Sequence, residues 1–478
     1  MGDRFFRLKT GRLFALSISA NIFDITSLQN NLYKNLVRDW SLNMSEFNFF
    51  QHWYPLLPIE DIDPQKPTTA TVLGIPLVIW TQDSKTYQVF LDRCPHRLAP
   101  LSEGRVDESG NLMCSYHGWQ FDVKGECKRI PQADNPDLIS KQSDNLCVTV
   151  YPSRQENDLL WAWMDADSPE LAAKTALPLS DKIDASKGYV WSSMVRDLEY
   201  DWQTLVENVA DPSHVPFSHH GIQGNRDRAM PIPLQIVRST IDAIEARVDK
   251  PFKTTITFEP PCHLEYDIFL PGGDKQIGLI TYCLPVSPGK SRIVAQFSRN
   301  FAQKLNSIVP RWWDHIQNRN AVLDGDMVLL HQQENFLQNT NWKTAYKMPA
   351  SADRLVIEFR NWFDRYCDGR LPWNEVGVTT ASPSIETPRE VLLDRYHQHT
   401  QHCSSCRNTL KTIEIAQKVL LASAAIAVST VAVLPDNLRV SLGLYLTISA
   451  LLGLGIYAVL RLWLMPKFYF VDYLHSDR

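Results

Sequence analysis

Two short cysteine–histidine motifs constrain this chain more than any other stretch of its sequence. Cys94 and His96 form a Cys-x-His motif, Cys114 and His117 form a Cys-x-x-His motif, and 17 residues separate the two. The chain has nine cysteines in 478 residues, and this odd number in a long chain is not typical of a small disulfide scaffold. Two thiolates and two imidazoles in such motifs predict a metal centre, so the fold must bring both motifs to one place.

The residues around the motifs indicate which metal centre this is. A zinc ion binds such a ligand set, whereas a Rieske [2Fe–2S] cluster holds both cysteines on one iron and both histidines on the other. The stretches CPHR and CSYHGWQFDVKGEC resemble the Rieske patterns C-x-H-R and C-x-x-H-G-W-x-F-x-x-x-G. Ala99 and Tyr116 stand where Rieske proteins of respiratory complexes carry two further, disulfide-forming cysteines. This departure resembles the oxygenase branch, in which the cluster feeds electrons to a second iron.

A second ligand set lies further along the chain. The stretch ENVADPSHVPFSHHG contains Asp211, His214 and His219 in the spacing D-x-x-H-x4-H, which resembles the mononuclear iron motif of Rieske oxygenases. Two histidines and one carboxylate bind non-haem Fe(II) and leave positions open for O2 and substrate. The resemblance implies that His214 and His219 bind the iron. It also implies that Asp211 is not a ligand but carries electrons from the Rieske histidine of a neighbouring subunit.

Helix geometry places a condition on this iron site. Asp211 and His214 are three residues apart and would share a helix face, but His214 and His219 are five apart, about 140° around an ideal helix. The two histidines converge only if the helix breaks, and Pro216 between them predicts such a break. His220 is a rival ligand with a less suitable spacing.

The third iron ligand should be a carboxylate from a later segment. The helical stretch LDGDMVLLHQQENF offers Asp324, Asp326 and Glu334. Its pattern D-x-V-x-x-x-x-Q resembles the ligand helix of the family and matches Asp326. We therefore predict Asp326 as the ligand, with Asp324 as the alternative.

Two apolar segments near the end of the chain, about 413–434 and 440–463, are almost free of charge and are joined by the five residues PDNLR. Their length and composition predict a transmembrane hairpin rather than a pair of buried core helices. Basic residues flank both segments: Arg407, Lys411, Lys418, Arg461 and Lys467. By the positive-inside rule, the large N-terminal part lies on the cytoplasmic or stromal side.

A Cys-x-x-Cys motif, Cys403 and Cys406, precedes the hairpin. It could be a redox dithiol, half of a metal site with His399 or His402, or merely a pair of linker cysteines. Together, the Rieske core, the D-x-x-H-x4-H motif, the stretch DRYHQHTQHCSSCR and the apolar pair resemble the pheophorbide a oxygenase family over roughly residues 46–470. That family includes translocon-associated and protochlorophyllide-dependent chloroplast relatives. Its Cys-x-x-Cys is thought to permit thioredoxin-type regulation, which favours the redox dithiol.

The resemblance implies an oxygenase that uses O2 and electrons from ferredoxin to oxidise a chlorophyll-derived macrocycle, by ring opening of pheophorbide a or by oxidation of a related chlorophyllide. It also implies a homotrimer in a cyanobacterial thylakoid or plasma membrane, or in a chloroplast membrane. The lack of an evident long transit peptide favours a cyanobacterial member. Two alternatives remain: a Rieske monooxygenase for another hydrophobic substrate, and a membrane electron carrier or redox sensor without oxygenase turnover. The net charge of −5 argues against a nucleic-acid partner.

The expected fold class is α+β. The apolar runs TVLGIPLVIW and YQVFLDR, separated by the polar turn TQDSKT, predict strands of a small all-β Rieske domain. A helix-grip-like catalytic domain, an antiparallel sheet with helices, should follow. Residues 1–43 could be a simple extension, a targeting segment, or sequence ahead of a true start at Met44. The expected units are an extension (1–45), the Rieske domain (46–170), the catalytic domain (186–395), a Cys-x-x-Cys linker (396–411), the hairpin (412–465) and a tail (466–478).

Overall fold

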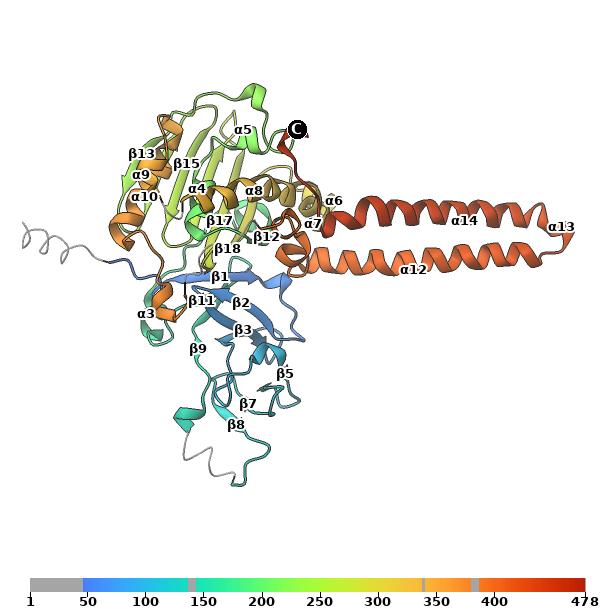
Figure 1. Cartoon of the computed structure of the whole chain (residues 1–478), viewed down its shortest axis with the longest axis horizontal. Coiled ribbons are helices and arrows are strands. Elements are labelled where there is room, and N and C mark those ends of the chain that lie inside the picture. Colours follow the sequence, from blue (N-terminus) through green and yellow to red (C-terminus); the bar gives the residue numbers. More distant parts are fainter. Residues whose placement is uncertain (1–45, 136–142, 338–339, 380–386, 478) are drawn as a thin grey trace, which may run out of the picture.

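Two antiparallel β structures lie end to end in this chain, and a long helical hairpin projects from the larger one (Figure 1). The computed structural model describes residues 46–135, 143–337, 340–379 and 387–477. The expectations for the N-terminal extension, 1–45, lie outside the described residues.

The smaller β structure carries the Cys/His motifs of residues 94–117 and consists of three antiparallel sheets, with strand orders β1-β11-β10, β2-β3-β4-β9 and β5-β6-β7-β8. Indole, aliphatic and aromatic side chains of β1 and β11 fill its contact with the larger structure. The strands are β1 (Trp53–Pro58), β2 (Thr68–Val72), β3 (Ile75–Thr81), β4 (Tyr87–Leu91), β5 (Arg105–Val106), β6 (Leu112–Met113), β7 (Gln120–Phe121), β8 (Cys127–Arg129), β9 (Val150–Tyr151), β10 (Ser153–Glu156) and β11 (Leu159–Trp163). The short helices are η1 (Ile59–Asp61), η2 (Leu101–Glu103), η3 (Ser143–Leu146) and α3 (Pro169–Lys174).

The run TVLGIPLVIW is a β-hairpin, not the single strand that we predicted. Strands β2 and β3 pair up to Val72 and Ile75, and only Leu73 (φ 53°) and Gly74 (φ 75°) form the turn. Positive φ at both turn residues gives the twist that a two-residue hairpin needs. Such turns usually have the sequence Asn-Gly, but this one is Leu-Gly, and leucine seldom adopts a positive φ. Tertiary contacts hold the turn, since Leu73 is fully buried and its N–H donates to the carbonyl of Pro285.

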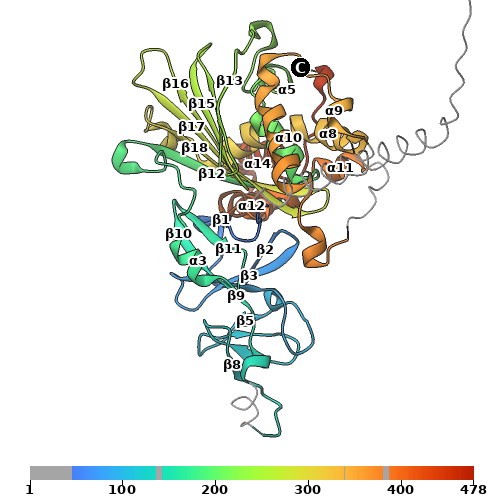
Figure 2. The ribbon, with the colours of Figure 1, turned by 90° about the vertical axis from the view of Figure 1, so that its left-hand side faces the viewer.

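The larger β structure is one seven-stranded antiparallel sheet in the order β12-β18-β17-β16-β15-β14-β13. Helices α4 and α10 pack against it, and α5, α8, α9 and α11 lie on the same side of the sheet as α10 (Figure 2). Its strands are β12 (Val190–Leu198), β13 (Gln235–Ser239), β14 (Ile244–Val248), β15 (Lys253–Glu259), β16 (His263–Phe269), β17 (Gln276–Ser287) and β18 (Lys290–Arg299). Its helices are η4 (Ala185–Lys187), α4 (Trp202–Ala210), α5 (Val215–Ser218), η5 (Arg226–Arg228), α6 (Leu305–Ile308), α7 (Arg311–Asp314), η6 (His315–Arg319), α8 (Asn320–Leu337), α9 (Trp342–Ala345), η7 (Ser351–Asp353), α10 (Arg354–Cys367), η8 (Trp373–Val376) and α11 (Arg389–Leu392).

The projecting hairpin consists of two long helices, α12 (Ser404–Val433) and α14 (Leu442–Val459), joined by the short α13 (Asp436–Arg439). Both helical spans are long and apolar enough to cross a membrane, and only 17% and 11% of their most apolar windows are buried inside the protein. The π-helical turn η9 (Tyr396–Thr400) precedes the hairpin. The turns η10 (Leu460–Leu464) and η11 (Met465–Phe468) and a tail with η12 (His475–Asp477) follow it.

The Cys-x-x-Cys motif lies in the first turn of α12 and not, as we predicted, in a linker over 396–411. Cys403 is the N-cap residue of the helix, and Cys406 lies inside it. The cap comes from a distant residue: the Asp61 carboxylate accepts hydrogen bonds from the N–H of Ser404 at 2.7 Å and from its hydroxyl at 2.8 Å. A carboxylate at a helix N-terminus satisfies an unpaired N–H and interacts favourably with the helix dipole. The sequence around the motif contains no sign of this cap.

Candidate functional site

Two loops of the small β structure have the same backbone turn and present the Cys/His motifs. The carbonyl of Cys94 accepts from the N–H of Leu98 at 2.9 Å, and the carbonyl of Cys114 accepts from the N–H of Gly118 at 3.0 Å. Leu98 (φ 61°) and Gly118 (φ 72°) both take the left-handed conformation that this turn requires. Each loop therefore directs one cysteine inward and carries a histidine, two or three residues later, on its outer side.

The four side chains divide into a buried sulfur pair and a more exposed imidazole pair. Cys94 and Cys114 are at most 2% exposed, whereas His96 is exposed and His117 half-buried. The two imidazole centroids are 4.5 Å apart, and His96 stacks on Trp119. The four donors do not all lie within 4.8 Å of one another, unlike the two other candidate metal groups among the described residues. This spacing suits a [2Fe–2S] cluster, which spreads its ligands over two irons, better than a single zinc ion.

The helix before the iron-site histidines ends earlier than we predicted. Helix α4 ends at Ala210, and the following Asp211 is extended (φ −100°, ψ 102°), so Asp211 and His214 do not share a helix face. Pro212 accounts for the break, because a residue before proline avoids the helical conformation. Pro216, which we expected to break the helix, lies in the first turn of α5, where proline is well tolerated.

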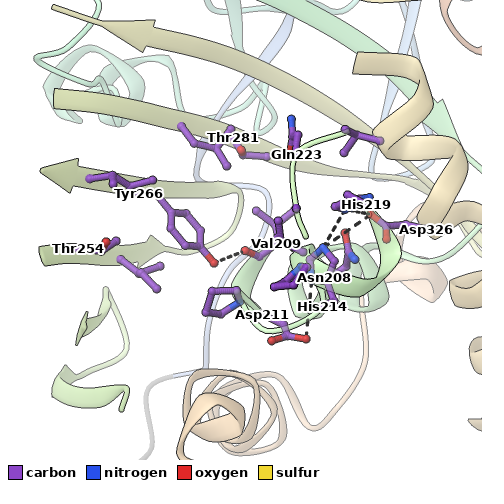
Figure 3. A pocket seen from close by; sticks show the side chains of 18 of the residues that line it. Asn208, Val209, Asp211, His214, His219, Gln223, Thr254, Tyr266, Thr281 and Asp326 are labelled. Carbon is purple, nitrogen blue, oxygen red and sulfur yellow. Dashed lines mark hydrogen bonds and ion pairs between the residues drawn. The ribbon is translucent and has the colours of Figure 1, made fainter. Parts of the chain in front are cut away.

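His214, His219 and Asp326 converge on one point (Figure 3). The Nε2 atoms of the two histidines are 3.2 Å apart, and Oδ2 of Asp326 is 3.3 Å from Nε2 of His219 and 3.9 Å from Nε2 of His214. Metal–ligand bonds of about 2 Å place neighbouring ligand atoms about 3 Å apart, close to the separations of 3.2 and 3.3 Å that Nε2 of His219 makes with the other two ligands. Two imidazoles and one carboxylate are the donor set of a mononuclear non-haem iron site, so these residues fit that metal.

The rival ligands make other contacts. Asp324 is fully buried between Arg196 and Arg395, with Oδ1 2.6 Å from Nη2 of Arg196 and Oδ2 2.8 Å from Nε of Arg395. Glu334 accepts a hydrogen bond from the backbone N–H of residue 201, and Nδ1 of His220 accepts one from the N–H of residue 226. Of the two neighbouring aspartates on α8, only Asp326 therefore faces the two histidines.

Asp211 lies beside the iron-site histidines without joining their donor group. Its Oδ2 is 3.7 Å from Nδ1 of His214, the ring nitrogen that points away from the metal position. Its Oδ1 accepts from the N–H of Ser213 at 2.7 Å and from the hydroxyl at 2.5 Å. Burial opposes ionisation here, but His214 and the hydrogen bonds of Ser213 outweigh it and lower the pKa of Asp211. The carboxylate side chain remains 27% exposed, so another molecule can reach it.

A cavity of about 460 Å³ opens onto these three residues. Side chains of the large sheet and of the segment after α5 form its mostly apolar wall: Met230, Ile232, Val248, Phe252, Ile256, Ile268, Leu279, Ile293, Ala295 and Phe297. A few polar groups interrupt this wall, among them Thr254, Tyr266 and Thr281 (Figure 3). The Tyr266 hydroxyl donates to the carbonyl of Val209, and burial raises the tyrosine pKa, so the group stays protonated. A mostly apolar wall with a few polar groups is typical of cavities that bind hydrophobic small molecules.

The tail after the hairpin returns to the iron site, which the sequence did not reveal. The hydroxyl of Tyr473 donates to the carbonyl of Ser218 at 2.6 Å, next to His219. Gly325, between the two aspartates of α8, allows this approach, because a Cβ there would lie 2.9 Å from the Ser218 oxygen and 3.1 Å from the Tyr473 ring. The backbone of the histidine segment therefore packs directly on the helix that carries Asp326.

Cys403 and Cys406 belong to a second buried group. Their sulfur atoms, together with ring nitrogens of His315 and His399, all lie within 4.8 Å of one another. His399 therefore accompanies the Cys-x-x-Cys, whereas His402 contacts Asp197 and Gln401 instead. His315 was absent from our sequence interpretation, because it is 84 residues from His399 and has no motif of its own.

Comparison with known proteins agrees with the geometry. Family models match as "Rieske [2Fe-2S] domain" over residues 52–152 and as "Pheophorbide a oxygenase" over residues 258–343. The chain is 35% identical to the chloroplastic pheophorbide a oxygenase of Oryza sativa subsp. japonica, covering 90% of this chain and 86% of the relative. It is also 35% identical to the chloroplastic flavonoid 8-hydroxylase 2 of Ocimum basilicum, covering 81% of this chain and 78% of the relative.

Among solved structures, dicamba monooxygenase bound to dicamba matches with a TM-score of 0.56 and 21% identity, covering 67% of this chain and 98% of that one, which shows a shared fold. The predicted cofactors, a Rieske cluster and a mononuclear iron, are confirmed by these matches together. The sequence similarity to the plant oxygenase extends over nearly the whole chain and includes both candidate iron sites. The chain therefore belongs to the pheophorbide a oxygenase family of Rieske non-haem iron oxygenases.

Proposed function

We propose that this oxygenase acts on a chlorophyll-derived macrocycle, either pheophorbide a, which it would open, or a related chlorophyllide. The observation that carries the proposal is the apolar cavity of about 460 Å³ that opens onto His214, His219 and Asp326. A flat hydrophobic ligand buries its faces against such walls, while a few polar groups, such as Thr254 and Thr281, orient it. Relatives named pheophorbide a oxygenase and chlorophyllide a oxygenase support this class of substrate.

The site residues take the following roles in this proposal. Cys94, Cys114, His96 and His117 hold the [2Fe–2S] cluster, and His214, His219 and Asp326 hold the mononuclear iron. When bound, the cluster supplies single electrons and the iron activates O2. The protein positions the substrate in the apolar cavity and keeps water from the reacting atoms. Asp211, beside Nδ1 of His214, links the iron site to an incoming electron.

The position of the two sites supports transfer between subunits. The sheet of β5 to β8, whose β6–β7 connection is one of the Rieske loops, lies at the end of the small β structure away from the large sheet, and α5 lies toward the opposite end of the molecule in both views (Figures 1 and 2). The partly exposed Asp211 would therefore receive electrons from His96 or His117 of another copy. A closed ring satisfies every site in this way, and we propose a homotrimer. Ferredoxin would dock near the Rieske loops.

The hairpin supports a membrane location. Its outer surface is apolar over most of its length, with Ile426, Val428, Val433, Val440, Leu451, Leu452 and Leu462 among its exposed side chains. Soluble proteins rarely expose so large a contiguous apolar surface to water. At its base, the ring centroids of Trp313 and Trp463 lie 6.2 Å apart. Tryptophan side chains are enriched at membrane–water interfaces. We propose that α12 and α14 anchor the catalytic part to the cytoplasmic or stromal face of a thylakoid, plasma or chloroplast membrane.

The flavonoid 8-hydroxylase relative keeps one alternative open, a Rieske monooxygenase for a different hydrophobic substrate. The other alternative, an electron carrier without turnover, gains no support from the geometry, because a carrier has no need of a second iron. Thioredoxin regulation through Cys403 and Cys406 stays a prediction. Both thiols are buried in this structure, so a reductant would reach them only after the start of α12 moves.

The proposal is tested by turnover of the purified full chain with ferredoxin, its reductase and ¹⁸O2. Pheophorbide a, chlorophyllide a, protochlorophyllide a and a flavone are supplied in parallel, and mass spectrometry reads the products. We expect ¹⁸O in the product of one pigment and none in the flavone. Label in the flavone alone would overturn the proposed substrate class. With no product from any compound, an iron content of about two per chain instead of about three would favour the carrier.

A further inference from the structure

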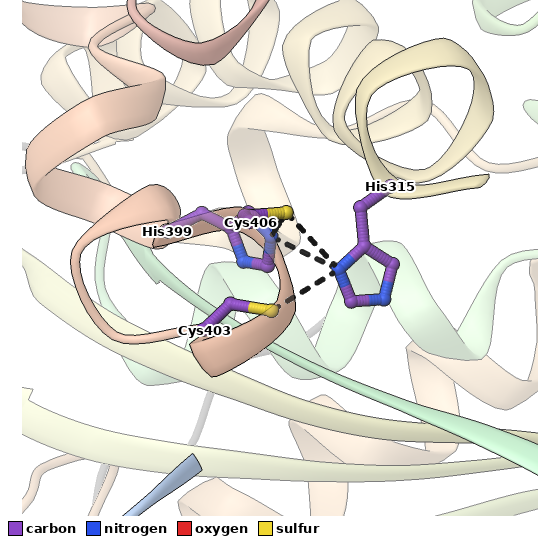
Figure 4. A group of neighbouring side chains, drawn as sticks. All are labelled: His315, His399, Cys403 and Cys406. Atoms are coloured by element: carbon purple, nitrogen blue, oxygen red, sulfur yellow. Dashed lines mark hydrogen bonds between the residues drawn. The ribbon is translucent and has the colours of Figure 1, made fainter. Parts of the chain in front are cut away.

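Four buried side chains at the base of the hairpin bring four potential metal-ligand atoms within 4.8 Å of one another. His315 comes from η6, His399 from η9, and Cys403 and Cys406 from the start of α12. Their donor atoms point toward one another, and none of the four side chains is more than 2% exposed (Figure 4). We propose that His315, His399, Cys403 and Cys406 bind a structural zinc ion, which makes the two cysteines metal ligands in place of the redox dithiol that the family resemblance implies.

The separations of the donor atoms match a tetrahedron around zinc. With Zn–N bonds of about 2.05 Å and Zn–S bonds of about 2.3 Å, the tetrahedron has edges of about 3.3 Å between nitrogens and about 3.6 Å between nitrogen and sulfur. The distance from Nδ1 of His315 to Nε2 of His399 is 3.1 Å. From Nδ1 of His315 the two sulfurs are 3.6 Å (Cys403) and 3.8 Å (Cys406), and Nε2 of His399 is 3.4 Å from Cys406. Each of these four edges lies within about 0.3 Å of the expected value.

The surrounding hydrogen bonds prepare these donors for a metal. Nδ1 of His399 donates to the carbonyl of Val195 at 2.6 Å, which leaves the lone pair of Nε2 directed at the centre of the group. Nη2 of Arg311 lies 3.3 Å from the sulfur of Cys403 and donates to it, as expected beside a thiolate. Arg311 also pairs with Asp61, the residue that caps α12. These contacts hold His399 and Cys403 in the way that outer hydrogen-bond partners hold the ligands of metal sites.

Charge and burial favour zinc over an empty site. Two thiolates neutralise Zn²⁺, so the filled site carries no net charge into the interior. Without a metal, Nδ1 of His315 faces three potential partners, His399, Cys403 and Cys406, and one ring nitrogen has no more than one proton to share with them. Four protein ligands leave no open position for water or substrate, which is typical of a structural zinc and not of a catalytic one.

The proposed zinc would connect the membrane hairpin to the iron site. His315 lies in η6, which continues directly into α8, the helix of Asp326. Cys403 and Cys406 begin α12, the first helix of the hairpin. Binding all four residues would hold the hairpin at a fixed angle to the helix that carries an iron ligand. This role does not depend on which substrate the enzyme oxidises.

The test measures zinc in the full chain, purified in detergent after expression in zinc-containing medium. We expect about one zinc per chain beside the iron, and Zn K-edge X-ray absorption with about two sulfur and two nitrogen neighbours. The matched pair of variants is His399→Gln and His402→Gln, three residues apart in the same segment. The first should lose most of the zinc, and the second should keep it, with the Rieske spectrum present in both.

Three results would overturn the proposal. One is a Cys403–Cys406 disulfide without zinc in the freshly isolated protein, read by mass spectrometry after alkylation under non-reducing conditions. The second is zinc with only nitrogen and oxygen neighbours, since that signal would come from adventitious zinc at His214, His219 and Asp326. The third is absence of zinc with both thiols free. The absorption and alkylation measurements use the unmodified protein, so a variant that fails to fold leaves the proposal testable.

Discussion

Two aspartates on α8, Asp324 and Asp326, are separated by a single residue and should have separable roles. Asp326 faces His214 and His219, whereas Asp324 is enclosed by Arg196 and Arg395. We predict that Asp324→Asn weakens the fold and leaves the iron ligands in place. Asp326→Asn should instead remove the mononuclear iron and leave the fold intact. The two substitutions change the same atoms on the same helix, so each is the control for the other.

The size of the Asp324 effect follows from its burial. Asp324 and Arg196 are 0% exposed, and Arg395 is 2% exposed, so water cannot replace the lost charge. An asparagine can accept from one arginine only, because its amide nitrogen would face the donors of the other. Removing one partner of a buried ion pair costs about 3–5 kcal/mol, chiefly because the remaining charge is left uncompensated. For a unit of about 200 residues, this predicts an apparent melting temperature lower by roughly 6–20 °C.

The assay measures melting, iron and the Rieske signal in the same detergent-purified samples. Thermal unfolding followed by tryptophan fluorescence should place Asp324→Asn well below the parent protein and Asp326→Asn near it. Iron analysis should give about three irons per chain for the parent and for Asp324→Asn at low temperature, and about two for Asp326→Asn. The electron paramagnetic resonance signal of the reduced cluster should persist in both variants.

The reasoning would be refuted by the reverse pattern. If Asp324→Asn lost one iron at an unchanged melting temperature, Asp324 would be the iron ligand. Its ion pairs with Arg196 and Arg395 would then not form in the active enzyme. Three irons in Asp326→Asn would likewise remove Asp326 from the ligand set.

Three further predictions concern neighbouring residues. Asp211→Ala should keep both metal centres and the fold but lose turnover; full activity would exclude Asp211 from electron transfer. Gly325→Ala should lower the content of mononuclear iron, because the new Cβ would lie 2.9 Å from the Ser218 oxygen and push α5 off α8; unchanged iron and melting would contradict this close packing. Burial, and then the nearby carboxylate of residue 201, raise the pKa of Glu334 to about 7. Since folding must hold this acid protonated, stability should fall as the pH rises from about 5 through 7, and Glu334→Gln should flatten that decline in unfolding experiments; an equal slope in both proteins would refute it.

The sequence by itself determined the chemistry that depends on short spacings. Cys94, His96, Cys114 and His117 lie in two tight loops. The spacing within each motif is set by a local backbone turn, so the motif can be recognised from the sequence alone. The apolar helices near the end of the chain could also be predicted from the sequence, because length and composition alone indicate them. The family match over residues 52–152 confirms the Rieske domain, and the structure confirms the two long apolar helices; the four cluster ligands stay a prediction.

Tertiary structure decided what depends on residues far apart in the chain. The choice of Asp326 over Asp324 depends on Arg196 and Arg395, which are 128 and 71 residues away from Asp324. The start of α12 depends on a cap from Asp61, 343 residues before Ser404.

The surroundings of the Cys-x-x-Cys also depend on tertiary structure. The sequence left His399 and His402 open, and packing of η6 against α12 brings in His315 and favours His399. Sequence spacing records which residue types lie near one another along a helix or loop. Long-range packing, driven by burial of apolar surface and pairing of buried charge, determines which of them face the same point.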